Sequence, residues 1–384
     1  MNNLLRHYAE TLEALASQDL LRKLPVAAQA EPLARRMDFS GNDYLGLASR
    51  QELVDAAQEA GRLYGAGSTG SRLLSGNTPL HEAFEARIAR DKGSEAALIF
   101  TSGYQANAAC IAALLDQHTL GSEPLVFADR LNHASMHLGC ALAEARQVRY
   151  RHLDLEHLAE LLEKHKADKR PKFILSETVF GMDGDRADVV ALQKLSLAHG
   201  ALLYLDEAHA TGLFGPRGYG LTEALDLAPT TFVMGTLSKA VGVSGGYVAC
   251  ARVLRDYIVN KAGGFIFSTA PSPLVVGAAL RAWEMLPGLS AQREQLQENA
   301  AWLRASLGLA GFDTGTSSTH IVPVILGDAD RTLRAKARLA ELGITVSAVR
   351  PPTVPQGTSR LRLGLSAAHS REDLAALVEA MKGL

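Results

Sequence analysis

A lysine at position 239 stands among residue types that could use it chemically. It closes the segment TLSK (236–239), in which Thr236 and Ser238 supply two hydroxyl groups, and an apolar run (230–235) leads into it. An ammonium group at the end of an apolar strand must be paired or must lose its charge. A surface lysine in a turn would give the same pattern, so the segment alone does not decide whether Lys239 is reactive.

A second group of candidates lies one predicted strand earlier. Asp206 ends the apolar run ALLYL, and His209 follows three residues later. An aspartate in this place could simply cap a turn. In a low-dielectric pocket it could instead keep a pyridine ring nitrogen protonated, and pyridoxal phosphate enzymes combine such a carboxylate with a Schiff-base lysine. His133, in DRLNHASM, could stack on such a ring or could be an ordinary structural histidine.

A phosphate group would find donors in the segment IFTSGYQANAA (99–109). Its pattern predicts a strand, a turn of small residues and the start of a helix. The backbone N–H groups of Gly103 and Tyr104 would then point at the phosphate, assisted by the helix dipole. Thr236 and Ser238 could donate further hydrogen bonds to the same group.

The region from about residue 95 to 250 must position these residues, and its pattern predicts an α/β fold. Short apolar runs alternate with helical patterns, which indicates a mostly parallel sheet covered by helices on both faces. The predicted strands are 96–100, 124–128, 172–177, 201–207, 230–235 and 246–250, and the predicted helices between them include 106–115, 155–165 and 189–200. Ligands bind beyond the carboxyl ends of such strands. The segments TSGY, ETVFGMDGD, DEAHATG and TLSK all fall there.

The pattern changes near residue 285, where a smaller α+β domain is expected. A long helix (290–308) precedes short strands at 321–326, 344–349 and 360–365 and a terminal helix. We therefore predict an N-terminal helix and extended segment (1–45), a large domain (46–285) and a small domain (286–384). The glycine-rich stretch 65–77 contains GxGxxG, but it follows a helical pattern rather than a strand, which argues against a nicotinamide dinucleotide site.

Composition limits the classes of function. The net charge of −2 gives no general attraction to nucleic acid or to anionic membranes. No apolar run has the length of a membrane helix, and three isolated cysteines show no metal-binding or redox spacing. A cytoplasmic enzyme without a metal site and without nucleic-acid or membrane partners is the expectation.

Five segments carry a resemblance to a known family. They are FSGNDYLGL (39–47), DRLNHASMH (129–137), ETVFGMDGD (177–185), DEAHATGLFG (206–215) and TLSKAVGVSGG (236–246). The chain resembles the α-oxoamine synthase family of pyridoxal phosphate enzymes over nearly its whole length. The resemblance implies the aspartate-aminotransferase-like fold (fold type I), and a homodimer to which 65–77 and 267–273 contribute from the neighbouring subunit.

The resemblance also implies a cofactor, pyridoxal 5'-phosphate, and roles around it. Lys239 would hold it as a Schiff base and then take the Cα proton of an amino-acid substrate. Asp206 would pair with the ring nitrogen and His209 with the phenolate oxygen, while His133 stacks on the ring. The other implied cofactor-binding residues are Gly103, Tyr104, Gly181, Thr236 and Ser238. Position 181 is a departure, since a close relative in this family carries serine there.

Substrate preference is implied by the segment 348–369, with its RPPTVP motif. It is most similar to the member that joins L-alanine to a pimeloyl thioester, carried by coenzyme A or by an acyl-carrier protein, with loss of CO2. The implied substrate-binding residues are Arg22, Asn42, His133, Arg350, Thr353 and Arg362. A bidentate arginine suits a carboxylate. Arg362 is the first choice and Arg350 the second, and for each the alternative is a solvated charge on a strand.

A second departure, besides Gly181, and three alternatives remain. Arg22, in LLRKLP, only imperfectly matches an arginine-rich segment of the relative. The activity could belong to another family member, one that uses glycine or serine with a different acyl thioester. The chain could also be a catalytically silent cofactor-binding module, which the joint presence of Asp206, His209 and Lys239 argues against. A nucleotide-dependent oxidoreductase would depend on the GxGxxG alone.

Overall fold

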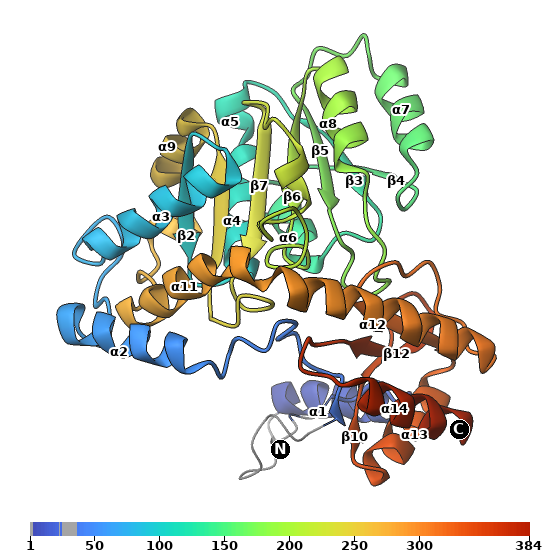
Figure 1. Cartoon of the computed structure of the whole chain (residues 1–384). Helices are drawn as coiled ribbons and strands as arrows, with labels where there is room; N and C mark the ends of the chain where they lie inside the picture. Colours follow the sequence, from blue (N-terminus) through green and yellow to red (C-terminus); the bar gives the residue numbers. More distant parts are fainter. Residues whose placement is uncertain (1–2, 23, 25–36) are drawn as a thin grey trace. The chain divides into compact units, whose positions relative to one another are not determined.

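The computed structural model describes residues 3–22, 24 and 37–384, and it divides into two compact units (Figure 1). The smaller unit comprises the described residues of Met1–Asn42 together with Met182–Gly184 and Gln295–Leu384, and the larger comprises Asp43–Gly181 and Asp185–Glu294. Much of the predicted N-terminal extended segment falls on 25–36, outside the described residues. The division into domains at residues 45 and 285 stays a prediction.

The larger unit is built on a seven-stranded sheet in the order β2-β8-β7-β6-β5-β3-β4. The strands are β2 (Ala96–Phe100), β3 (Leu125–Asp129), β4 (Gln147–Tyr150), β5 (Lys172–Glu177), β6 (Ala201–Asp206), β7 (Thr231–Thr236) and β8 (Gly246–Cys250). Only β8 runs antiparallel to its neighbours, β2 and β7. The predicted mostly parallel sheet is therefore confirmed. Strand β4 was not predicted, because it lies at the edge and its QVRY sequence is only partly buried.

Alternation of side chains sends two hydrophobic clusters to opposite faces of this sheet. In β3, Val126 and Ala128 join the cluster with Ala106 and Cys110 of α4. Leu125 and Phe127 join the other cluster, which contains residues of α7 and α8. Both faces are thus covered, which is why the inner strands read as continuous apolar runs rather than alternating ones.

Helices of the larger unit follow the strands in the predicted alternation (Figure 1). They are α2 (Gln51–Tyr64), α3 (Pro79–Lys92), α4 (Gly103–Leu114), α5 (Gln117–Leu120), α6 (Ala134–Leu142), α7 (Leu155–Lys164), α8 (Val189–Ala198), α9 (Arg252–Lys261), α10 (Gly263–Ile266) and α11 (Pro273–Met285), with two 3-10 turns, η2 (Leu221–Ala224) and η3 (Leu286–Leu289). Among the described residues, no helix has both the length and the hydropathy needed to cross a bilayer.

The smaller unit has two short sheets and several helices. Its elements are α1 (Asn3–Ser17), β1 (Met37–Asp38), β9 (Ile321–Gly327), α13 (Ala329–Glu341), β10 (Ile344–Thr345), β11 (Ser347–Val349), β12 (Ser359–Gly364) and α14 (Arg371–Lys382), with α12 (Ser290–Leu309) leading into it. The predicted single strand 344–349 is wrong in one respect. It divides around the buried Val346, so that β10 pairs with β1 and β11 pairs with β12.

Candidate active site

The carboxyl ends of four strands meet at one edge of the large sheet. Glu177 at the end of β5 is the register partner of Asp206 at the end of β6. Thr236 of β7 and Phe100 of β2 both lie opposite Gly246, the first residue of β8. The four polar segments predicted to follow strand ends are therefore brought to the same edge.

Lys239 meets His209 at this edge. Its Nζ lies 2.8 Å from His209 Nε2, and His209 Nδ1 lies 2.8 Å from the hydroxyl oxygen of Tyr44. Gly181 makes this arrangement possible, because a Cβ built at that position would lie only 2.4 Å from His209 Nε2. Tyr44 was not predicted as a site residue, although it lies in the FSGNDYLGL segment that carries the family resemblance.

The carboxylate of Asp206 is buried and held at both oxygens. Oδ1 accepts a hydrogen bond of 2.8 Å from the backbone N–H of Ala208, and Oδ2 accepts one of 2.7 Å from Asn107 Nδ2. Asn107 was missed because it sits in the apolar helical pattern ANAAC, where nothing in the spacing marks it. A fixed, buried carboxylate is suited to holding a cationic ring nitrogen.

His133 is the N-cap of α6, and its Nδ1 lies 2.6 Å from the hydroxyl oxygen of Ser135. Part of the residue is exposed to solvent. Partial burial of the ring lowers the pKa of His133, the nearby Asp206 raises that pKa, and the nearby Lys239 lowers it. Nearby, burial raises the pKa of Glu177 well above its usual range, and the like charge of Asp206 adds to this rise. Both effects favour the neutral form of the Glu177 carboxyl.

Hydroxyl groups and a helix N-terminus form a place for a phosphate. Thr236 Oγ1 lies 2.8 Å from Ser238 Oγ, and helix α4 begins beside them at Gly103. A Cβ built on Gly103 would lie 3.2 Å from Thr236 Cβ, and one on Gly246 would lie 2.7 Å from Gly103 N. Bare backbone N–H groups and two hydroxyls fit an anionic phosphate. The side chain of Tyr104 is half exposed next to this turn.

The predicted substrate-binding residues other than His133 lie in the smaller unit. Arg362 on β12 is buried, and its Nη2 donates a 3.1 Å hydrogen bond to Asn42 Oδ1. Arg22 donates through Nη2 to Thr353 Oγ1 at 3.3 Å. Arg350 donates to the carbonyl oxygen of Asp19. Of these three arginines only Arg362 is buried, and its role in substrate binding stays a prediction.

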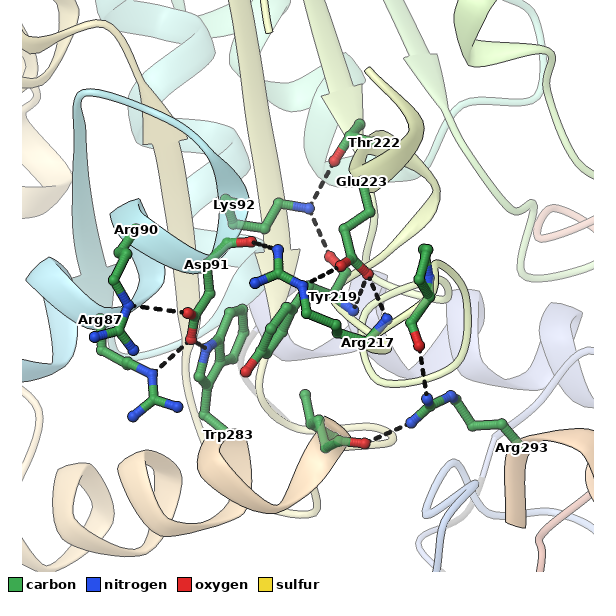
Figure 2. Close-up of polar contacts among 12 residues, drawn as sticks. Arg87, Arg90, Asp91, Lys92, Arg217, Tyr219, Thr222, Glu223, Trp283 and Arg293 are labelled. Atoms are coloured by element: carbon green, nitrogen blue, oxygen red, sulfur yellow. Dashed lines mark hydrogen bonds and ion pairs between the residues drawn. The ribbon is translucent and has the colours of Figure 1, made fainter. Parts of the chain in front are cut away.

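A buried ion pair secures the turn that follows Asp206. The Lys92 ammonium, at the end of α3, pairs with the Glu207 carboxylate, and both side chains are fully buried. Lys92 Nζ also donates to Thr222 Oγ1 and to the carbonyl oxygen of Tyr219, each at 2.6 Å (Figure 2). Glu207 directly follows Asp206, so this pair fixes the backbone that carries Asp206 and leads to His209. The sequence reads as a surface charge run (ARDK) at a helix end, which hides the role of Lys92.

A second ionic cluster joins the loops after β3 and β5. His152 Nδ1 lies 2.9 Å from Asp129 Oδ1, and Nε2 lies 3.1 Å from Asp185 Oδ2. Burial alone would lower the pKa of His152, but its hydrogen bonds to the two carboxylates raise that pKa to about 10. The His152 imidazolium thus links two loops, one that leads to His133 and one that carries Gly181.

Stability is therefore expected to depend on pH through His152. Because the folded pKa lies above the unfolded value of about 6.5, the contribution is complete below about pH 6.5 and disappears as the pH rises through about 10. Wild-type protein should exceed His152→Gln in unfolding free energy by about 2–4 kcal/mol at pH 6, and the difference should shrink by pH 10. Urea unfolding at a series of pH values measures it. His118→Gln, at an exposed position, should show no such difference. If the difference in unfolding free energy between wild type and His152→Gln stayed constant with pH, the proposed role of the His152 charge would be contradicted.

This architecture is the aspartate-aminotransferase-like fold, in which a lysine and an aspartate follow neighbouring strands. The family model described as Aminotransferase class I and II matches residues 34–381. The chain belongs to this family, and the fold class expected from the sequence is confirmed.

Individual proteins that are similar to this chain carry more specific names than the family does. A protein of Gluconacetobacter diazotrophicus named 8-amino-7-oxononanoate synthase is 46% identical over 386 residues, 98% of this chain and 96% of that protein. A relative in Magnetococcus marinus, given the same name provisionally, is 52% identical over 345 residues, 90% of this chain and 87% of its own. A serine palmitoyltransferase from S. paucimobilis with PLP and myriocin bound has a TM-score of 0.90 at 28% identity, covering 100% of this chain and 98% of that chain.

Proposed function

We propose that this protein uses pyridoxal 5'-phosphate to join L-alanine to a pimeloyl thioester, releasing CO2 and free thiol and giving 8-amino-7-oxononanoate for biotin synthesis. The observation that carries the proposal is the Lys239–His209 contact next to the buried Asp206, in a chain 43–52% identical to relatives of that name. When bound, the cofactor supplies an electron sink that makes a Cα proton removable.

The residues of this chain would divide the work. Lys239 would bind the cofactor's aldehyde carbon and, as a neutral amine, take the Cα proton of alanine. Asp206 would hold the ring nitrogen, and His209 would hold the phenolate oxygen in the space that Gly181 leaves. The phosphate would be bound by Thr236, Ser238 and the backbone N–H groups of Gly103 and Tyr104. His133 would stack on the ring.

Substrate binding would draw on the smaller unit. Arg362, with Asn42 as its hydrogen-bond partner, is our choice for the substrate carboxylate, ahead of Arg350. Arg22 and Thr353, which contact each other, are proposed to bind the acyl substrate. A guanidinium that is already buried and oriented loses less freedom when it binds a carboxylate in two-point fashion.

We further propose a homodimer. The glycine-rich stretch 65–77 and the segment 267–273 are joined within one chain, since the N–H of Ala270 donates to the carbonyl oxygen of Gly70 at 2.9 Å. Their large side chains Leu74 and Phe267 are 81% and 87% exposed, which favours a partner surface there. Light scattering should give twice the mass of the 41.0 kDa chain, and the mass of a single chain would contradict it.

A substrate panel tests the activity. Protein saturated with pyridoxal phosphate is assayed with L-alanine, glycine or L-serine, each combined with pimeloyl, acetyl, succinyl or palmitoyl coenzyme A and with pimeloyl-acyl-carrier protein. Alanine with a pimeloyl thioester should exceed every other pairing in kcat/KM by about tenfold or more. Preference for glycine or serine would make it a different member of the family. Cofactor binding without turnover of any pair would make it a binding module.

A further inference from the structure

A branched set of hydrogen bonds crosses the interior of the larger unit behind the candidate site. Its centre is Asn107 on α4, which contacts Tyr204 and Asp206 on β6 and Ser135 on α6. Ser135 in turn contacts His133. Asn107, Ser135 and Tyr204 are at most 1% exposed. None of these three residues has a role in the proposed reaction, so their polar groups need an explanation.

The chemistry of Asp206 fixes the orientation of Asn107. An ionised carboxylate only accepts hydrogen bonds, so the amide atom 2.7 Å from Asp206 Oδ2 must be the nitrogen. Its second N–H donates to Ser135 Oγ at 2.9 Å. The remaining amide atom, Oδ1, accepts the hydroxyl hydrogen of Tyr204 at 2.8 Å. Both N–H hydrogens and the oxygen of the Asn107 amide therefore have hydrogen-bond partners. An amide rotated by 180° would place its oxygen against the Asp206 carboxylate.

The orientation of Asn107 then fixes Ser135 and, through it, His133. Because Ser135 Oγ receives a hydrogen from Asn107, its own hydrogen is left to donate to His133 Nδ1, 2.6 Å away. The backbone N–H of Ser135 also points at Nδ1, at 3.3 Å. A ring nitrogen that accepts two hydrogen bonds carries no proton. The ring proton must therefore be on Nε2.

We propose that Asn107 and Ser135, oriented by Tyr204, are positioning residues that hold the Asp206 carboxylate in place and lock His133 as the neutral tautomer with its proton on Nε2. A neutral imidazole of this form presents one hydrogen-bond donor at its outer nitrogen, suited to a carbonyl or carboxylate oxygen of a bound substrate. That last use rests on the proposed function, whereas the tautomer itself does not.

The environment of the ring agrees with a neutral imidazole. Lost solvent lowers the pKa of His133, and the nearby Lys239 and His137 lower it as well, although Asp206 raises it. Protonation at Nδ1 would also break both bonds from Ser135. The Asn107 side chain thus orients two groups that would contact different parts of the cofactor. Asp206 would contact the ring nitrogen, and His133 would contact the ring face.

Nitrogen-15 NMR of histidine-labelled protein, with the His133 signals assigned from their loss in His133→Asn, tests the lock without cofactor or substrate. Wild-type protein should show the Nε2–H form. Ser135→Ala removes the hydroxyl donor, so the two tautomers should become populated within a factor of about ten of each other. Tyr204→Phe, a milder change, should shift the population in the same direction. Ser196→Ala and Tyr150→Phe remove other buried hydroxyls of the larger unit and should leave the signals unchanged.

The outcomes separate this proposal from the proposed activity. A cationic or Nδ1–H His133 in the wild type would overturn the proposal, as would an unaltered tautomer in both Ser135→Ala and Tyr204→Phe. With cofactor bound, Ser135→Ala should also lose about 10- to 100-fold in kcat. If the wild type turns over no substrate pair, the proposed activity fails, while the NMR result for the lock still stands.

Discussion

Replacing Lys239 with alanine is expected to lower turnover by about 10⁴-fold or more and to abolish covalent attachment of the cofactor. The reason is chemical, since the neutral amine of Lys239 would serve both as attachment point and as proton acceptor. Asp206, Thr236 and the start of α4 remain, so pyridoxal phosphate should still bind without a covalent bond. Mass spectrometry after borohydride reduction measures the linkage, and steady-state kinetics measure the turnover.

The exposed Lys261 supplies a matched control for this experiment. It pairs with Asp116 at 3.7 Å and lies on α9, so Lys261→Ala should keep both covalent linkage and turnover within about twofold. Reduced cofactor attached to Lys239→Ala, or turnover above about 1% of the wild type, would show that another amine carries the chemistry.

Replacing Lys92 with methionine is expected to lower the free energy of unfolding strongly. It would leave the fully buried Glu207 carboxylate without its cation, and breaking such a pair costs about 3–5 kcal/mol. Thr222 would still donate to Glu207 through its N–H and its hydroxyl, each at 2.8 Å, so part of the network survives. Because Glu207 follows Asp206, affinity for pyridoxal phosphate should fall as well. Urea unfolding and cofactor titration measure the two effects.

Two further variants isolate the buried charge as the cause. Arg90 is a neighbouring cation on the same helix, but its side chain is 65% exposed. Its partner, the buried Asp91, would keep its hydrogen bonds from Arg87 and from Trp283 Nε1, so Arg90→Met should cost no more than about 1 kcal/mol. The double variant Lys92→Met/Glu207→Leu removes both charges and should recover much of the lost stability. Equal losses in Lys92→Met and the double variant would point to packing rather than charge.

The sequence predicted those strands that are buried on both faces of the sheet. β5 and β6 are continuous apolar runs because helices cover both faces of the sheet. The end of each apolar run therefore marks the end of the strand. β4 was missed because an edge strand with polar side chains has no such pattern. The division of 344–349 depends on which strand lies alongside each half, a tertiary fact that no local pattern records.

The candidate site divides in the same way. Lys239, Asp206 and His209 could be proposed from the sequence because they follow two neighbouring predicted strands, whose carboxyl ends meet, and because together they match one known chemistry. Asn107 and Lys92 could not, since one sits in an alanine-rich helix and the other in a charge run that reads as solvent-facing. Their roles come from partners far away in the chain, Asp206 and Glu207, which only the folded structure supplies.

The pairing of β1 with β10 sets an order for the making of this protein. Met37 and Asp38 emerge early from the ribosome, but their strand partners are Ile344 and Thr345. Phe39 continues the connection, since its N–H donates to Thr345 and its carbonyl oxygen accepts from Gly364, each at 2.8 Å. The larger sheet can assemble from contiguous segments during synthesis, whereas the smaller unit must wait for residues 344 to 364. A chain released early would therefore hold a formed sheet together with an unfinished N-terminal segment, and would be a natural substrate for chaperones.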